Sequence, residues 1–323
     1  MMLNESNIID TLKNTFPTHI GDDAAVIEFN ADNHYVISKD LLVEGTHFRL
    51  KYQDAASLAH KALHVNLSDI AAMGATPQFV LLGLSIPQYF EPQTELFLNA
   101  FTQACKASSV LLIGGDTTHT SDSLFISVTA LGIAPTKQIK LRSQAKYGDM
   151  ICVAGNLGHA HLGFTALETS HDHIKDLEYK HRFLKPTARL REGVWLGEQP
   201  EITGMMDVSD GLYLDLKRFC KASHLGANIH LEALQSSASF KNTCHTLKLD
   251  PITTQLTGGE DYGLMVSISQ QAYTKITHQF KQAFGYDLIP IGKFHDGTGV
   301  QVLKNNKQIE LNLKPFSHFG EIN

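Results

Sequence analysis

Acidic residues recur beside glycines and short apolar runs throughout this sequence of 323 residues. The positions are Asp22-Asp23 after Gly21, Asp40, Asp69, Asp116 after Gly114-Gly115, Asp207 with Asp210, and Glu260-Asp261 after Gly258-Gly259. Sites in α/β proteins are commonly built at strand ends and in such loops, which predicts that these side chains converge. Like charges a few ångströms apart raise one another's pKa, so carboxylates that converge require cations between them.

The residue types in this pattern indicate phosphate chemistry. Carboxylate oxygens without cysteine or histidine partners favour Mg²⁺ or Mn²⁺ over zinc. Mg²⁺ commonly bridges carboxylates to phosphate oxygens, and backbone N–H groups beside paired glycines can approach an anion closely. We therefore expect a polycarboxylate site that binds metal ions and phosphate groups.

Single members of the pattern have plainer interpretations. Asp210 could equally cap the helix that follows it, and Asp22 and Asp23 could form a solvated turn. Asp69 is harder to explain in this way, because aspartate is a poor helix former and here falls within an apolar helical period. His47 is the one histidine retained as a site candidate, and we expect most of the other histidines at the surface.

Several well-known catalytic motifs are missing from the sequence. There is no G-x-x-x-x-G-K-[ST] loop, neither H-R-D nor D-F-G occurs, and no G-x-S-x-G elbow is found. A P-loop enzyme, a protein kinase and a hydrolase with a nucleophilic serine elbow are therefore excluded.

Both helices and strands must position the acidic residues. Hydrophobic periodicity predicts helices over 8–15, 54–74 and 91–108, and Asp54 is the expected N-cap of the second. It also predicts strands over 24–29, 35–38, 79–86, 110–113, 124–133 and 150–154. The strand at 110–113 is expected to be buried, and strand–helix alternation continues over 205–220 and 264–291. These elements predict a mixed α/β (α+β) fold in two halves, 1–137 and 138–323.

Composition excludes several classes of protein. Hydrophobic residues make up 43% of the chain and charged residues 19%, a globular balance that excludes disorder for most of it. A net charge of −6 and a pI near 6.3 lack the basic surface of a general nucleic-acid or anionic-membrane binder. Four scattered cysteines, a polar N-terminus and short apolar runs predict a soluble cytoplasmic protein with reduced thiols, no nucleic-acid partner and no membrane partner.

Motifs spread over nearly the whole chain carry a family resemblance. They are the segments 21–26 (GDDAAV), 40–48 (DLLVEGTHF), 61–77 (KALHVNLSDIAAMGATP), 114–118 (GGDTT), Arg142, 148–149 (GD), 182–189 (RFLKPTAR), 207–212 (DVSDGL) and 258–262 (GGEDY). With these motifs in this order, the sequence resembles the members of the thiamine-monophosphate kinase family. That family belongs to the superfamily of aminoimidazole ribonucleotide synthetase and selenophosphate synthetase.

The resemblance implies an activity and an architecture. The activity is ATP-dependent phosphorylation of thiamine monophosphate to thiamine diphosphate by direct transfer, with several Mg²⁺ ions and no phosphoenzyme. The architecture is that of aminoimidazole ribonucleotide synthetase. An N-terminal α/β half, 1–137, binds ATP and Mg²⁺ and forms a homodimer, and a C-terminal half, 138–323, completes the nucleotide and substrate site.

The resemblance also implies roles for individual residues. The metal ligands are Asp23, Ser38, Lys39, Asp40, Asp69, Asp116, Asp207 and Asp210, with Ser38 and Lys39 acting through their backbone. The contacts to ATP come from Gly115, Asp116, Arg142 and Ser209, and the thiamine end faces His47, Glu260 or Asp261, and Phe316. Asp210 and Arg142 are the residues expected to act in catalysis, where charge neutralisation dominates and no general base is required.

Three alternatives remain open at the level of sequence. A Mg²⁺-dependent phosphohydrolase could use the same carboxylates to activate water. Another ATP-using member of the superfamily is possible, although selenophosphate synthetase would need a reactive cysteine near the N-terminus and none precedes Cys105. A non-catalytic nucleotide sensor would have lost metal ligands, whereas every acidic position is present here.

Overall fold

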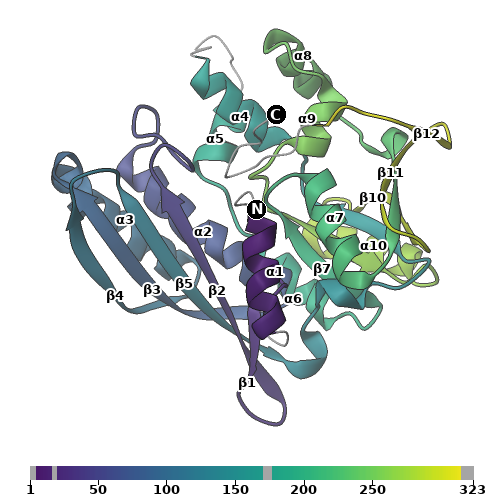
Figure 1. Ribbon diagram of the computed structural model, residues 1–323, viewed down its shortest axis with the longest axis horizontal. Coiled ribbons are helices and arrows are strands. Elements are labelled where there is room, and N and C mark those ends of the chain that lie inside the picture. The colour runs from purple at the N-terminus through teal and green to yellow at the C-terminus, as the bar shows by residue number, and fades with distance from the viewer. Residues whose placement is uncertain (1–4, 17–19, 170–176, 314–323) are drawn as a thin grey trace.

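Two mixed α/β halves lie side by side in the computed structural model, which describes residues 5–16, 20–169 and 177–313 (Figure 1). A five-stranded sheet has the strand order β1-β2-β5-β3-β4, and a seven-stranded sheet has the order β12-β11-β8-β10-β6-β9-β7. The predicted α/β fold with two halves is confirmed.

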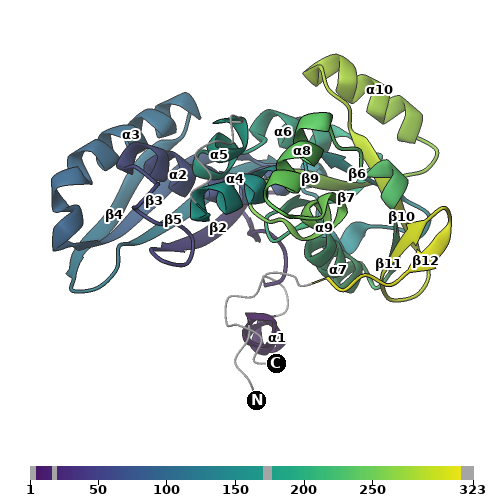
Figure 2. The same ribbon diagram turned by 90° about the horizontal axis from the view of Figure 1, so that it is seen from above.

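The first sheet is covered by helices on one face only. Its strands are β1 (Ala25–Glu28), β2 (Asn33–Val43), β3 (Thr76–Pro87), β4 (Leu111–Thr120) and β5 (Phe125–Pro135). Neighbours run antiparallel except for β3 and β4, which are parallel. Helices α2 (Ala55–Ala72) and α3 (Thr94–Ala107) pack on the same side of the sheet (Figure 2). Among the described residues, no helix covers the opposite face.

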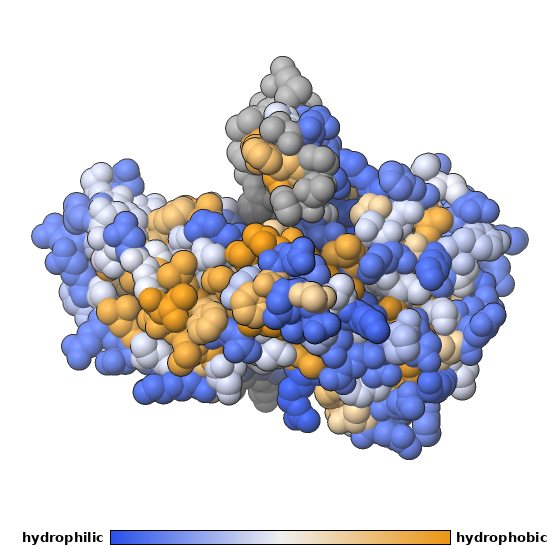
Figure 3. Space-filling view, turned by 90° about the horizontal axis from the view of Figure 1, so that it is seen from below, coloured by the Kyte–Doolittle hydropathy of each residue, from blue (hydrophilic) through white to orange (hydrophobic). Residues whose placement is uncertain are grey.

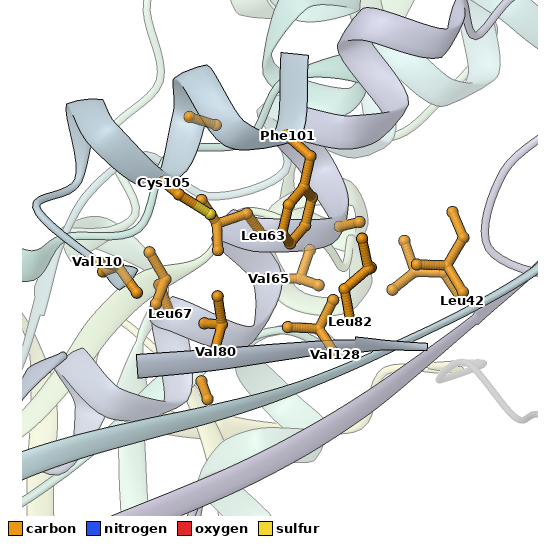
Figure 4. Close-up of a cluster of buried hydrophobic side chains, with 14 of the residues drawn as sticks. Leu42, Leu63, Val65, Leu67, Val80, Leu82, Phe101, Cys105, Val110 and Val128 are labelled. Atoms are coloured by element: carbon orange, nitrogen blue, oxygen red, sulfur yellow. The ribbon is translucent and has the colours of Figure 1, made fainter. Parts of the chain in front are cut away.

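Alternating burial along the strands produces the core beneath these helices. In β5, every second residue from Ile126 to Ala134 is buried, as the period of two of a strand requires. Figure 4 shows the buried cluster in which the two helices meet the sheet. Its members include Leu63, Leu67, Val80, Leu82, Phe101, Cys105 and Val128.

Helix α2 is the central element of the molecule. Asp54 caps it by accepting a hydrogen bond from the Ser57 N–H at 2.7 Å, as the sequence predicted for that residue. The helix ends before Gly74, whose φ of +72° and whose close approach to the Gln138 carbonyl exclude a side chain. Because α2 also packs against elements of the second half, its residues are available to a site shared by both halves.

In the second half, helices pack on both faces of the seven-stranded sheet. Its strands are β6 (Met150–Ala154), β7 (Ile202–Val208), β8 (Gly226–His230), β9 (Gly263–Ile268), β10 (Ile289–His295), β11 (Gly299–Lys304) and β12 (Lys307–Ile309). Its helices are α4 (His159–Glu168), α5 (Leu177–Leu184), α6 (Leu190–Glu198), α7 (Leu212–Ser223), α8 (Ala238–Thr246), α9 (Pro251–Thr257) and α10 (Tyr273–Phe284). Every residue of β9 is buried, which explains why all of its side chains except that of Ser267 are apolar.

Shorter elements complete the chain. They are α1 (Glu5–Thr15) and the 3₁₀ segments η1 (Gln88–Gln93), η2 (Thr136–Gln138), η3 (Arg142–Gln144) and η4 (Leu231–Ala233). Helix α1 stands out from the body (Figure 2). Among the described residues, no helix combines the length and the apolar character needed to cross a membrane, and all four cysteines are buried free thiols.

Three predictions about elements were wrong. The strand predicted as buried at 110–113 is the start of β4, an edge strand in which Leu111 is 63% and Ile113 55% exposed. Asp40 and Asp116 lie inside strands rather than after them. The helix predicted over 91–108 begins as the 3₁₀ segment η1 and becomes α-helical only at Thr94, after Pro92.

Candidate active site

A cavity of about 720 Å³ lies between the two halves. Its walls come from β2 and α2 of the first half and from β7, α4, α5 and the loops 209–210 and 257–262 of the second. Eleven of the predicted site residues line it: Asp23, Ser38, Lys39, Asp40, His47, Asp69, Arg142, Asp207, Ser209, Asp210 and Glu260.

Three carboxylates meet at one end of this cavity. Asp23 precedes β1, Asp69 lies on α2 and Asp207 on β7, and their ligand oxygens all lie within 4.8 Å of one another. Two hydroxyl groups hold this arrangement. Ser38 Oγ donates to Asp69 Oδ2, and Ser68 Oγ donates to Asp207 Oδ2 at 2.6 Å.

The surroundings of Asp69 and Asp207 disfavour the ionised form of each carboxylate. Burial, followed by the charges of Asp40, Asp207 and Asp23, raises the pKa of Asp69. Burial and the neighbouring Asp23 likewise raise the pKa of Asp207. Both groups would therefore hold protons more readily than an exposed aspartate does.

Arg142 compensates part of this negative charge. Its Nε and Nη2 donate to the two oxygens of Asp23 at 3.0 and 2.5 Å, and its backbone N–H donates to Asp22 Oδ1 at 2.7 Å. Burial alone would lower the pKa of Arg142, but the charge and hydrogen bonds of Asp23, together with the charges of Asp22 and Asp207, outweigh burial and raise the pKa. Since one guanidinium offsets one of three carboxylates, the oxygen donors that remain suit a divalent cation.

Neighbouring predicted ligands extend the acidic end. The Asp40 N–H donates to Asn66 Oδ1 of α2 at 2.9 Å, which places Asp40 close to Asp69. Lys39 directs its amine to Ser127 Oγ on β5, at 2.6 Å. The first bond fixes β2 to α2 and the second fixes it to β5, where Ser38, Lys39 and Asp40 line the cavity.

Asp210 reaches the cavity on a loop that a different aspartate stabilises. Asp215 accepts hydrogen bonds from the N–H groups of Ser209 and Asp210, at 3.1 and 3.0 Å. Arg218 donates to Asp210 at 2.5 Å and to Asp215 at 3.0 Å. The alternative in which Asp210 caps the following helix is wrong, since Gly211 takes the cap position and Asp215 satisfies the backbone.

The opposite end of the cavity is organised by a buried lysine. Lys61 on α2 is only 1% exposed, and its Nζ lies 2.6 Å from Glu260 Oε2 and 3.3 Å from the His47 carbonyl. The same Nζ lies 3.8 Å from the ring centroid of Phe183. His47 itself accepts the Val43 N–H at Nδ1, at 3.0 Å. Lys61 therefore links the two predicted substrate residues, His47 and Glu260.

Three of the predicted residues that the structure describes do not line this cavity. Asp261 uses both oxygens to accept the N–H groups of Gly158 and Ala160, at 2.5 and 2.9 Å, at the start of α4. Gly115 and Asp116 lie on the far edge strand, and Phe316 lies outside the described residues. Gly115 pairs with Leu82, which pairs with Val128, which pairs with Asp40. Three strand spacings therefore put the Gly115 and Asp40 backbones about 14 Å apart.

Several residues that line the cavity were missed as site residues from the sequence: Lys61, His161, Phe164, Phe183 and Arg218. His161 is partly buried and lines the cavity, unlike the surface position expected for most of the histidines. A signal was available for Lys61, because it lies eight residues before Asp69 and so on the same face of one helix. The aromatic residues carry no such signal.

The geometry as a whole has two chemically distinct ends. The acidic end can hold a divalent cation and, through it, phosphate groups. The end with Lys61, Glu260 and aromatic side chains can hold a ring system that carries polar atoms.

Comparison with known proteins gives consistent matches over nearly the full length. The family models "AIR synthase related protein" match with their N-terminal domain over residues 21–134 and with their C-terminal domain over residues 146–305. The thiamine-monophosphate kinase of Buchnera aphidicola subsp. Schizaphis graminum is 35% identical, over 93% of this chain and 92% of its own.

Solved structures agree in fold along the same length. AaThiL complexed with AMPPCP and TMP has a TM-score of 0.86 at 29% identity, covering 98% of this chain and 99% of its own. The thiamine-monophosphate kinase from Stenotrophomonas maltophilia K279a has a TM-score of 0.76 at 31% identity, covering 94% of this chain and 97% of its own.

Proposed function

Because this chain belongs to the thiamine-monophosphate kinase family of AIR synthase related proteins, we propose that the cavity between its halves is where ATP phosphorylates thiamine monophosphate. The chain is an ATP-dependent kinase that produces thiamine diphosphate and ADP. The observation that carries the choice of site is the convergence of Asp23, Asp69 and Asp207 beside Arg142.

Mg²⁺ is the metal that the donors fit. Asp23, Asp69 and Asp207 would hold it, and Asp40, Asp210 and the backbone at Ser38 and Lys39 offer further oxygen ligands along the same wall. Bound there, Mg²⁺ supplies neutralisation of phosphate charge. The raised pKa values of Asp69 and Asp207 support this assignment, since a cation is what would keep both groups ionised.

The reaction needs positioning more than acid–base catalysis. An oxygen of the acceptor phosphate attacks the γ-phosphorus of ATP in line. The bond from that phosphorus to the β–γ bridging oxygen breaks, and its electron pair stays on ADP. The acceptor oxygen is already ionised near neutral pH, so no side chain has to remove a proton. We assign Arg142, with Ser209, to the nucleotide, where a fixed guanidinium offsets developing charge.

The opposite end of the cavity is assigned to the thiamine part of the substrate, with His47 and Glu260 as contacts. Between Glu260 and Asp261, the contacts favour Glu260. Its side chain is 26% exposed beside the cavity, whereas both oxygens of Asp261 accept backbone N–H groups of α4. We therefore propose Glu260 as the substrate contact and Asp261 as the residue that positions α4.

A homodimer would account for the placement of Gly115 and Asp116. The uncovered face of the first sheet exposes Leu41 (46%), Leu81 (37%) and Ile113 (55%), and Figure 3 shows apolar side chains gathered over this half. We propose that a second copy covers this face. A two-fold axis running along the strands between β5 and β3 would place the partner's β4 over β2, beside the acidic end of the cavity.

Product formation by three proteins tests the proposed function. Wild type, Asp69→Asn and Asp210→Asn would be incubated with ATP, Mg²⁺ and thiamine monophosphate, after circular dichroism has shown that all three fold. We expect ADP and thiamine diphosphate in equal amounts from wild type. Each variant should lose at least about a hundredfold in kcat, the loss seen when a group that stabilises transition-state charge is removed.

Other outcomes would support the alternatives. ADP and inorganic phosphate without thiamine diphosphate would indicate a phosphohydrolase. Tight ATP binding without turnover would indicate a nucleotide sensor. Full activity of Asp69→Asn would contradict the assignment of the acidic end.

A further inference from the structure

One face of α2 runs the length of the cavity. Lys61, Val65 and Asp69 are spaced four residues apart, so they lie above one another on the same side of the helix, and all three line the cavity. At 1.5 Å per residue, Lys61 and Asp69 are separated by about 12 Å along the helix axis. The cavity therefore has a fixed length between its acidic end and its lysine end, with an apolar residue midway.

Two phenylalanines form a wall at the lysine end. Phe164 of α4 and Phe183 of α5 have ring centroids 5.3 Å apart, and both line the cavity. Phe183 is buried with Lys61 Nζ over its ring, and Phe164, which is partly exposed, has the Arg49 guanidinium 6.0 Å from its centroid. Phe164 is thus the member of the pair that can offer a ring surface to a ligand.

Ion pairs fix this aromatic wall to the first half. Glu168, at the end of α4, accepts from Tyr52 Oη at 2.8 Å and lies 3.0 Å from Arg49 Nε and 2.9 Å from Lys51 Nζ. Gln53 Nε2 donates to the Leu184 carbonyl at the end of α5, at 2.8 Å. Because both helices are anchored across the cavity, the distance from the wall to the acidic end is set by the fold.

We propose that Phe164 and Phe183 form a binding subsite for the aminopyrimidine ring of the substrate, and that this subsite selects thiamine monophosphate among phosphate esters. The inference rests on the proposed function. In thiamine monophosphate, the phosphate is joined through an ethyl group to the thiazolium ring, and the aminopyrimidine ring lies beyond it. With the phosphate at Asp69, the outer ring is the one that reaches the lysine end.

The polar groups at that end match the ring's hydrogen-bonding atoms. The exocyclic amino group of the aminopyrimidine can donate to Glu260, whose carboxylate reaches the cavity. A ring nitrogen can accept from Lys61 Nζ, which already lies between Glu260 and His47. A flat heteroaromatic ring can stack on Phe164 while these groups bind its edge.

Substitution of Phe164 tests the subsite. Calorimetry would measure binding of thiamine monophosphate, of the thiazole phosphate fragment that lacks the aminopyrimidine, and of a non-hydrolysable ATP analogue to wild type, Phe164→Leu and Phe164→Tyr. The control is Phe284→Leu, since Phe284 of α10 packs against Trp195 of α6 and lies outside the cavity. Steady-state assays would give kcat and the KM of each substrate.

Loss of the ring should weaken only the complete substrate. Phe164→Leu should raise the dissociation constant for thiamine monophosphate about three- to tenfold, as expected for one lost aromatic contact. Its affinity for the thiazole phosphate and for the ATP analogue should stay within about twofold of wild type, and Phe164→Tyr should restore binding.

Different results would contradict the subsite and the proposed function. If wild type forms thiamine diphosphate but Phe164→Leu binds thiamine monophosphate as wild type does, the subsite is wrong and the proposed function stands. Equal weakening of the fragment and the complete substrate would also overturn the subsite, because Phe164 would then act on the thiazole or phosphate. Failure of wild type to form thiamine diphosphate would overturn the proposed function itself.

Discussion

Asp207 is a carboxylate whose surroundings disfavour its charge. It is 2% exposed, and burial together with Asp23 raises its pKa. We expect Mg²⁺ to raise the melting temperature of wild type by a few degrees, since a ligand at a hundred times its dissociation constant stabilises by about 2.7 kcal/mol. In Asp207→Asn this response should be lost. Differential scanning calorimetry with EDTA or with Mg²⁺ measures both.

The same substitution has a second consequence without metal. Replacing Asp207 by the neutral amide removes repulsion with Asp23, so in EDTA the variant should melt no lower than wild type. Asp287→Asn is the matched control, because Asp287 pairs with Lys281 at the surface, outside the cavity. A full Mg²⁺ response in Asp207→Asn would show that the cation binds elsewhere.

Residue type explains which site residues could be recognised from the sequence. Aspartates stand out beside glycines or within an apolar helical period, because aspartate does not favour regular structure, and Asp23, Asp69 and Asp207 do converge. Phe164 and Phe183 could not be recognised, because an apolar residue at helical spacing indicates only packing. Which of Glu260 and Asp261 faces the cavity depends on the position of α4, which lies about a hundred residues away in sequence.

Elements were predictable where local signals decide them. The capping residue Asp54 and the strand at 150–154 are confirmed, since a cap and a short buried apolar run are read from a few residues. The prediction for β4 was wrong because an apolar run does not show whether anything covers it. Coverage depends on the order of strands in the sheet, which places β4 at an edge.

The packing of α2 against the segment after α5 predicts a pH dependence of stability. His64 Nδ1 accepts the Ala188 N–H at 3.3 Å, which requires a neutral ring, and the tilted ring of His60 has its centroid 4.1 Å from that of His64. Burial, assisted by the charge of His60, lowers the pKa of His64 to about 3. An unfolded histidine has a pKa near 6.5. As the pH falls below this value, the unfolded chain binds a proton at His64 while the folded chain does not, so the folded state loses stability.

The stabilisation from His64 is therefore present above pH 6.5 and lost between about pH 6.5 and 3. At pH 5 the loss is about 2 kcal/mol of unfolding free energy relative to pH 7.5. Urea titrations of wild type, His64→Gln and the exposed control His278→Gln would measure it. His64→Gln should show a smaller loss than wild type by about this amount, and His278→Gln should not. An identical loss in all three would contradict the account.

At the scale of the molecule, the cavity is made by two halves that are distant in sequence. Asp69 and Lys61 belong to the first half, and Asp207 and Glu260 to the second, so no local pattern could define their separation. The position of α2 between the halves determines it instead, because one face of this helix lines both ends of the cavity. Gly115 and Asp116 would reach a cavity only in the proposed homodimer, where the cavity belongs to the partner copy.

The proposed homodimer makes a prediction about mixed dimers. If the partner's Asp116 acts in the cavity that contains Asp69, the variants Asp69→Asn and Asp116→Asn should each be inactive as homodimers. A heterodimer of the two, co-expressed with different tags and purified on both, has one cavity with both substitutions. Its other cavity has Asp69 and Asp116 intact, so the heterodimer should recover about half of wild-type kcat.

The alternative geometry gives the opposite result. If Asp116 served the cavity of its own copy, each cavity of the heterodimer would carry one substitution, and it would stay as inactive as its parents. Replacing the exposed Ile113 by lysine separates assembly from chemistry, because a charge on a covered apolar edge should shift sedimentation towards the monomer. A monomeric Ile113→Lys protein that retains full activity would show that one copy holds a complete site, and that Asp116 does not act in the cavity of a partner copy.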